Sequence, residues 1–258
     1  MKYRLDELLV LKKLVESRIK AQKLILDGKV KVNGQVIYKI SKKFPQEVVI
    51  EVENPVDYVS RGGYKLEKAI TEFSKHNFSV EGKVCLDIGA STGGFTECLL
   101  NHKAKFVIAL DNGKSQLHPK LLKNPNVINI EKFNAKNIHL LFQNPTAFGI
   151  NLDIVKHVEI IVIDVSFISL THITQPLTLI DNKFKMITLI KPNFELTKQE
   201  RKYLKKGVLR DRKKVIQVLL RTLKTISKQG YKFIKVIESP IKGYKGNTEF
   251  LAYFIKEK

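Results

Sequence analysis

The sequence predicts an α/β protein, in which a doubly wound, mostly parallel sheet follows a small α+β domain. After residue 80, short and nearly continuous apolar segments alternate with helical patterns, as expected for parallel strands covered on both faces. The first 43 residues instead show two helical patterns and a hairpin. At 258 residues the chain is long enough for one large and one small domain. A break at Asn54-Pro55 places the expected boundary between residues 1–57 and 58–258.

The first domain begins with a helical pattern, in which Leu5, Leu8 and Leu9 form one apolar stripe. Ser17 is a suitable N-cap for a second helix over residues 18–26. Asn33-Gly34 lies between two short runs of alternating valines and predicts a β-hairpin. Another short strand is expected over residues 48–52.

The second domain is expected to contain five strands, over residues 84–88, 106–111, 160–165, 186–190 and 232–238. The clearest helical patterns between them cover residues 94–100 and 212–227. Residues 112–157 contain scattered Asn and no sustained period, so their elements cannot be assigned from the pattern.

The chain is strongly basic, with 46 Lys and Arg against 25 Asp and Glu and a formal net charge of +21. Such an excess indicates a polyanionic partner, nucleic acid first and an anionic membrane surface second. The basic residues gather in residues 1–43, with 12 Lys and Arg against 4 acids, and in residues 198–232, with 13 against 2. Two basic surfaces favour a ligand that is held at two places.

The longest apolar segments, such as residues 160–163, fall far short of the ~20 residues that span a bilayer. The N-terminus has no pattern of a secretory signal. Cys85 and Cys98 are too few for a disulfide framework or a four-thiolate zinc site, so we interpret both as packing groups. We therefore expect a cytoplasmic protein without a bound metal and without stable membrane insertion.

Spaced residues of the first domain resemble the RNA-binding domain of the ribosomal-protein S-four type: Arg4-Leu5-Asp6, Ser17-Arg18, Ala21, Leu24-Ile25, Gly28, Val30, Val32-Asn33-Gly34 and Lys39. The basic side chains that we expect on one side of this module, and that would meet RNA through phosphates, are Arg4, Arg18, Lys20, Lys23, Lys29 and Lys31. The alternative is a solvated charged face on a structural cap.

A glycine-rich loop, Asp87-Ile88-Gly89-Ala90-Ser91-Thr92-Gly93-Gly94-Phe95-Thr96, follows the first strand of the second domain and opens a helix. Its glycines let the backbone turn sharply, and the helix start presents free N–H groups to a ligand. Ser91 stands where a dinucleotide fingerprint needs glycine, so a nicotinamide site fits poorly. Asp111 ends the second strand, where an acid can bind ribose hydroxyls. A purely structural turn is the alternative.

The loop pattern resembles the S-adenosylmethionine loop of FtsJ-like RNA methyltransferases, which have a Rossmann-like fold. The resemblance implies that Asp87, Gly89 and Gly93 line the methionine end of S-adenosylmethionine and that Asp111 holds its ribose. Asn134 would meet the adenine, although a loop Asn is more often a turn residue. The remaining cofactor-binding residues on this interpretation are Ala90, Ser91, Gly94, Phe95, Thr96 and Asp164.

Asp164 and Lys191 directly follow apolar strands, at the edge of the sheet where ligands of open α/β sheets bind. Lys191 next to the core needs a partner, and Asp164 is the natural one. Taken alone, Lys191 could be a solvated strand-end lysine and Glu249 a surface acid. In the order Lys65, Asp164, Lys191 and Glu249, these residues resemble the catalytic tetrad of ribose 2′-O-methyltransferases. We expect Lys191 to activate the ribose hydroxyl.

Over nearly the whole chain, the sequence resembles the TlyA family, historically also labelled hemolysin A. The motifs that carry this resemblance are Ser60-Arg61-Gly62-Gly63, Lys191-Pro192-Asn193-Phe194-Glu195 and Gly207-Val208-Leu209-Arg210-Asp211. Asn193 departs from the family, which often has Gln there. The resemblance implies an enzyme that 2′-O-methylates cytidines of ribosomal RNA on ribosomal subunits, with Arg61 among its RNA contacts. We expect a monomer, although the sequence leaves the oligomeric state open.

Two alternatives come from other functional classes. A membrane-active cytolysin needs an amphipathic segment, and residues 213–227 are the best candidate, although a core-facing helix explains them better. A non-catalytic RNA-binding or ribosome-assembly factor would keep the fold without the chemistry. The basic residues of 201–206 and 210–214 suit either phosphate contacts or solubility.

Overall fold

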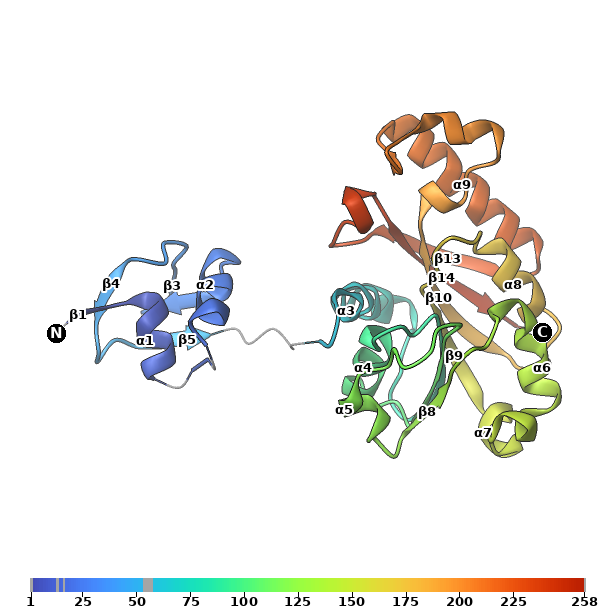
Figure 1. Ribbon diagram of the computed structural model, residues 1–258, viewed down its shortest axis with the longest axis horizontal. Helices are drawn as coiled ribbons and strands as arrows, with labels where there is room; N and C mark the ends of the chain where they lie inside the picture. Colours follow the sequence, from blue (N-terminus) through green and yellow to red (C-terminus); the bar gives the residue numbers. More distant parts are fainter. Residues whose placement is uncertain (1, 13, 16, 53–57, 258) are drawn as a thin grey trace. The chain divides into compact units, whose positions relative to one another are not determined.

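The computed structural model describes residues 2–12, 14–15, 17–52 and 58–257, and the chain forms two compact units, residues 1–57 and 58–258 (Figure 1). The break expected at Asn54-Pro55 lies outside the described residues. The two units are therefore considered separately.

The small unit packs two helices, α1 (Leu5–Leu11) and α2 (Arg18–Leu26), on short strands. The Ser17 Oγ accepts a hydrogen bond from the Lys20 N–H at 3.2 Å, which confirms the predicted N-cap. The predicted hairpin is confirmed as β2 (Val30–Val32) and β3 (Gln35–Val36), and β5 (Ile50–Val52) pairs antiparallel with β2. The sequence did not indicate β1 (Lys2–Arg4) and β4 (Lys43–Pro45), which form a separate antiparallel pair.

The small unit has a core of its own. Leu5, Leu8 and Leu9 of α1 are completely buried and belong to one apolar cluster with Ala21 and Ile25 of α2. The apolar stripe predicted for the first helix is thus confirmed.

The large unit is built on a seven-stranded sheet in the order β13-β14-β10-β9-β6-β7-β8. All its strands are parallel except β14, which pairs antiparallel with both β10 and β13. The strand bounds are β6 Val84–Ile88, β7 Phe106–Leu110, β8 Val127–Ile130, β9 Val158–Ile163, β10 Phe184–Ile190, β13 Lys232–Glu238 and β14 Phe250–Lys256. The predicted doubly wound, mostly parallel sheet is confirmed.

Helices cover both faces of the sheet (Figure 1). On one face, α3 (Arg61–Phe73) and α4 (Gly94–Asn101) share an apolar cluster with the strands. The helices packed on the other face are α6 (Ile138–Gln143), α7 (Leu152–Lys156), α8 (Thr171–Leu177) and α9 (Arg212–Lys228). A short helix, α5 (Pro119–Leu122), packs against β8.

Helix α9 contains the segment that a membrane-active protein would need. It buries Val215, Val218, Leu219 and Leu223 in the core, so it is the core-facing helix that the pattern favoured. In the described part of the chain, no helix combines the length and the apolar character needed to cross a membrane.

Candidate active site

The candidate site lies where the two halves of the sheet meet. β6 and β9 are neighbours, and the chain leaves β6 toward β7 on one side and β9 toward β10 on the other, so the loops at their carboxyl ends diverge and open a crevice. Two cavities of about 680 Å³ and 260 Å³ lie at this edge. Both are lined by Gly89 and Ser91 of the glycine loop and by Asp164 and Ser166 after β9.

The glycine loop needs its glycines because it passes other backbone closely. Gly89 has a φ of +88°, and a Cβ there would lie 2.4 Å from the Asp164 carbonyl oxygen. A Cβ on Gly94, at the start of α4, would lie 2.2 Å from the Ser60 Oγ at the start of α3. Only glycine therefore lets the loop cross the tip of β9 and lets the starts of the two helices pack together.

Asp111 directly follows β7 and lines the larger cavity. Its Oδ2 accepts a hydrogen bond from the Ser91 N–H at 2.8 Å, and its Oδ1 accepts one from the Gly113 N–H at 2.7 Å. Each carboxylate oxygen can accept a further bond, so the residue is fixed in place and still able to bind hydroxyl groups.

Asn134 also lines the larger cavity, together with the apolar Phe133 and Ala135. Its Oδ1 accepts a hydrogen bond from the Lys136 N–H at 3.1 Å and so caps a short 3-10 turn. Asn134 therefore acts as a turn residue, the alternative that the sequence left open, and it also lines the cavity.

Asp87, Thr96 and Gly93 line neither cavity. The Asp87 side chain is completely buried and its Oδ2 accepts a hydrogen bond from the Thr96 Oγ1 at 2.7 Å. Burial raises the pKa of Asp87 to about 7, the bond from Thr96 opposes this, and the negative charge of Asp164 adds to it. A Cβ on Gly93 would meet Leu121 of α5. These three residues therefore stabilise the glycine loop through buried contacts and do not face either cavity.

Lys191 follows β10, and its Nζ lies 2.6 Å from the Asp164 Oδ1. It also donates a hydrogen bond to the Ser166 Oγ at 2.9 Å. The lysine side chain is 11% exposed and the aspartate side chain 21%. The predicted pairing of Lys191 with Asp164 is confirmed.

Lys65 and Glu249 form a second ion pair, 2.6 Å between the Nζ and Oε2, although 184 positions separate them in the chain. Lys65 lies in the second turn of α3, so its motif forms the start of a helix. Lys65, Asp164 and Lys191 line the smaller cavity together, with Glu249 paired to the buried lysine.

Phe167 is an exposed cavity residue that the sequence did not single out. It has a φ of +65°, its side chain is 88% exposed, and it lines the larger cavity with its ring centroid 5.1 Å from that of Phe194. Phe167 belongs to the loop between β9 and α8. Glu195 holds the end of that loop, because it accepts hydrogen bonds from the Ser169 Oγ at 2.6 Å and the Leu170 N–H at 2.8 Å. The sequence could not indicate this, because an apolar residue such as Phe167 is ordinarily expected to be buried.

Two of the predicted RNA-binding arginines also have structural partners. Arg4 and Arg18 bind the buried Asp6, at 3.0 and 2.8 Å. Burial would raise the pKa of Asp6, but hydrogen bonds from Arg4, Arg18 and Gln22 outweigh burial and hold it well below its usual value. Lys20 and Lys23 lie on α2, and Lys29 and Lys31 lie before and within β2. The exposed Arg61 lines the smaller cavity.

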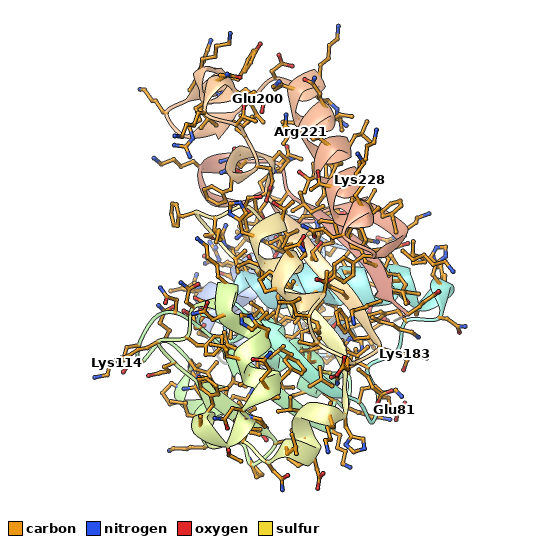
Figure 2. The ribbon with its side chains drawn as sticks, turned by 90° about the vertical axis from the view of Figure 1, so that its right-hand side faces the viewer. Glu81, Lys114, Lys183, Glu200, Arg221 and Lys228 are labelled. Atoms are coloured by element: carbon orange, nitrogen blue, oxygen red, sulfur yellow. The ribbon has the colours of Figure 1, made fainter. Side chains whose placement is uncertain are left out.

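Glu200 connects the basic segment before α9 to two basic side chains of that helix. Arg221 binds both carboxylate oxygens of Glu200 at 2.7 Å, and Lys214 binds Oε1 at 2.7 Å (Figure 2). The pKa of Glu200 is lowered mainly by its hydrogen bond with Arg221, and further by Lys214 and the Thr197 N–H, against the effect of burial. The exposed basic residues of this segment are Arg201, Lys202, Lys205, Lys206 and Arg210.

The larger cavity suits S-adenosylmethionine. Its volume lies in the range of small-ligand sites, Asp111 offers free acceptor positions, and Phe133 and Ile173 provide apolar wall. Asp111 would hold the ribose, Phe133 and Asn134 the adenine, and Gly89 and Ser91 the methionine end. With the sheet order and the glycine loop, this arrangement defines the class of S-adenosylmethionine-dependent methyltransferases.

Comparisons with known proteins agree with this class. The family model of the FtsJ-like methyltransferases matches residues 58–256, and that of the S4 domain matches residues 4–50. The chain belongs to the FtsJ-like methyltransferase family and, through its relatives over nearly the whole length, to the TlyA family. In this chain an S4 domain precedes the methyltransferase domain. The expected resemblances to the S4 domain, to the FtsJ-like methyltransferases and to the TlyA family are thus confirmed.

Hemolysin A of Brachyspira hyodysenteriae is 45% identical over 254 residues, which cover 98% of this chain and 99% of that protein. The 16S/23S rRNA (cytidine-2′-O)-methyltransferase TlyA of Mycobacterium tuberculosis is 34% identical and covers 97% of this chain and 88% of its own length. A solved structure described as a hemolysin from Streptococcus thermophilus has a TM-score of 0.67 and 34% identity, and it covers 99% of this chain and 88% of its own.

Proposed function

We propose that the protein transfers a methyl group from S-adenosylmethionine to the ribose 2′-hydroxyl of a cytidine in ribosomal RNA. The observation that carries the proposal is the Lys191–Asp164 ion pair, since Asp164 and Ser166 line both cavities and Lys191 lines the smaller one. The S4 domain, the positive charge and the relatives named as rRNA (cytidine-2′-O)-methyltransferases support an RNA substrate. Ribosomal RNA as substrate makes the cytoplasm the expected location.

S-adenosylmethionine supplies a methyl group on a positively charged sulfur. The target ribose would enter the smaller cavity, where Lys191 contacts the 2′-hydroxyl. As an ammonium, Lys191 lowers the pKa of the hydroxyl, whose proton then passes to water; if Lys191 has first lost a proton to solvent, its neutral amine accepts the hydroxyl proton instead. Asp164 orients the Lys191 ammonium through the 2.6 Å contact. Lys65, held by Glu249, lines the same cavity and would position the nucleotide. Holding the two reactants in line supplies much of the rate.

Phe167 is placed to hold the base of the target nucleotide. Its ring is exposed at the larger cavity, one residue after Ser166, which contacts Lys191. A base that leaves its stack in RNA loses stacking energy, and an exposed aromatic face restores part of that energy. We propose that Phe167 stacks on the target cytosine while its ribose lies against Lys191.

The test is a methyl-transfer assay with the purified protein, labelled S-adenosylmethionine and ribosomal subunits. We expect label on a ribose 2′-hydroxyl for the wild type and its loss, by at least about a hundredfold, in Lys191→Ala. Lys183→Ala, at the opposite end of the same strand, serves as the matched control and should keep normal activity.

RNA binding should persist in Lys191→Ala, because the variant keeps both basic segments. Methylation at the normal rate by Lys191→Ala would contradict the role of that lysine. Absence of label on any ribose with the wild type would contradict the proposed reaction. Mapping ribose methylation in ribosomal RNA from cells with and without the gene then identifies the nucleotide.

A further inference from the structure

A group of metal-binding side chains lies outside the active site, where α3 and α4 pack together. Cys98 and His102 are four residues apart near the end of α4, so they lie on one face of that helix. Glu67 reaches them from α3. One donor atom from each residue, a sulfur, a nitrogen and an oxygen, lies within 4.8 Å of the other two.

The spacing of these atoms is close to that of a tetrahedral zinc site. The His102 Nε2 lies 3.0 Å and the Cys98 Sγ 3.8 Å from the Glu67 Oε2. Zinc bonds of ~2.0–2.3 Å place neighbouring ligand atoms ~3.4–3.6 Å apart. The two distances to Glu67 need shifts of only a few tenths of an ångström to reach this spacing, and the sulfur and the imidazole nitrogen lie within 4.8 Å of each other. A thiolate with an imidazole and a carboxylate suits Zn²⁺ and does not suit Mg²⁺ or Ca²⁺.

We propose that Glu67, Cys98 and His102 bind one Zn²⁺ ion, with water in the fourth position. Binding releases the Cys98 thiol proton to solvent. The Tyr58 hydroxyl donates a hydrogen bond to the Glu67 Oε2 at 2.5 Å and orients the carboxylate, as outer partners of metal ligands do.

The ion can reach this site from the surface. Cys98 is completely buried, but the side chains of His102 and Glu67 are 31% and 39% exposed. His102 also borders a surface hollow of about 340 Å³. The Cys98 thiol is therefore inaccessible to solvent, whereas the side chains of the other two ligands are partly exposed.

Zinc would connect the two helices that frame the active site. Glu67 comes two residues after Lys65 on α3, and α4 begins in the glycine loop at Gly94. None of the three ligands lines either cavity of the active site. We therefore expect the ion to stabilise the pairing of α3 with α4 without taking part in methyl transfer.

The test titrates Zn²⁺ into the full-length chain after treatment with EDTA, in competition with a chromophoric chelator. We expect one zinc per chain, and with Co²⁺ the charge-transfer absorption of a cobalt–thiolate bond. His102→Gln and Cys98→Ser should each weaken zinc binding by more than the roughly 10- to 100-fold loss typical of an outer partner. His76→Gln, an exposed histidine on the neighbouring 3-10 turn, is the matched control and should bind like the wild type.

Thermal unfolding provides an independent measurement, because an ion that binds only the folded state raises Tm. Zinc should raise the Tm of the wild type and of His76→Gln, and it should leave His102→Gln unchanged. The half-exposed His102 and Glu67 make His102→Gln and Glu67→Gln informative even if Cys98→Ser folds poorly. Equal zinc binding by wild type and His102→Gln, or no cobalt–thiolate absorption, would overturn the proposal. Methyl transfer is not the readout, so this result is independent of the proposed reaction.

Discussion

At the scale of single residues, Asp87 combines complete burial with a pKa raised to about 7. In the unfolded chain an aspartate titrates near pH 3.9, so between about pH 4 and 7 the folded state holds a proton that the unfolded state has lost. The free energy of unfolding should therefore fall as the pH rises through this interval, by up to about 4 kcal/mol. Asp87→Asn should remove this contribution.

Urea unfolding at pH 5 and pH 8 measures the effect. The loss of stability between the two values should be about 2.5 kcal/mol smaller in Asp87→Asn than in the wild type. Asp153→Asn, an exposed N-terminal position of α7, is the control and should follow the wild type. Parallel pH profiles for wild type and Asp87→Asn would show that the buried carboxyl is ionised in the folded protein.

Phe167 carries the second prediction at this scale. Phe167→Ala removes the exposed ring, so methyl transfer should fall by about 10- to 100-fold, the equivalent of ~1–3 kcal/mol of base stacking. Phe167→Tyr keeps an aromatic face and should retain most activity, whereas Phe167→Leu should resemble Phe167→Ala. S-adenosylmethionine binding, measured by calorimetry, should be similar in all three. Full activity in Phe167→Ala would rule out the stacking role.

At the scale of elements, the short hairpin before α9 offers exposed positive charge. The hairpin comprises β11 (Leu204–Lys205) and β12 (Val208–Leu209), and it follows the 3-10 turn η5 (Gln199–Tyr203). The Asn247 Oδ1 accepts a hydrogen bond from the Leu209 N–H at 3.0 Å and so holds the hairpin to the segment before β14. The choice between phosphate contacts and simple solubility can be decided by experiment.

Replacing Arg201, Lys202 and Lys205 with Gln should weaken RNA binding and flatten the dependence of log K on log salt by about three units at most. The same change at Lys75, Lys103 and Lys183, which lie at the amino edge of the sheet, is the matched control and should alter the slope less. An unchanged slope in the first variant would assign the segment to solubility.

The elements also show what the sequence can and cannot predict. β6, α4 and α9 were predictable almost to the residue, because an apolar run or a helical period is a local property. β8 lies in the segment 112–157 that has no clear period, and β14 is antiparallel, which follows from its neighbours rather than its own residues. The Lys191–Asp164 pair followed from strand ends, whereas contact between Lys65 and Glu249 required the position of α3. The cluster of Glu67, Cys98 and His102 was missed because its carboxylate comes from a distant part of the chain.

At the scale of the whole molecule, the two units have separate apolar cores, and all residues of the candidate active site belong to the large unit. Residues 58–258 alone should therefore bind S-adenosylmethionine with the affinity of the full chain in calorimetry. Their affinity for ribosomal RNA should be lower, and the salt dependence less steep, because the charges of the S4 domain are gone. Equal RNA affinity with and without residues 1–57 would assign recognition to the methyltransferase unit.

The position of β14 has a consequence for truncated chains. This strand lies between β10 and β13, and it directly follows Glu249, the partner of Lys65. A chain that stops before residue 249 has a gap inside its sheet and a lysine without its carboxylate. Such a chain should therefore have no partial activity.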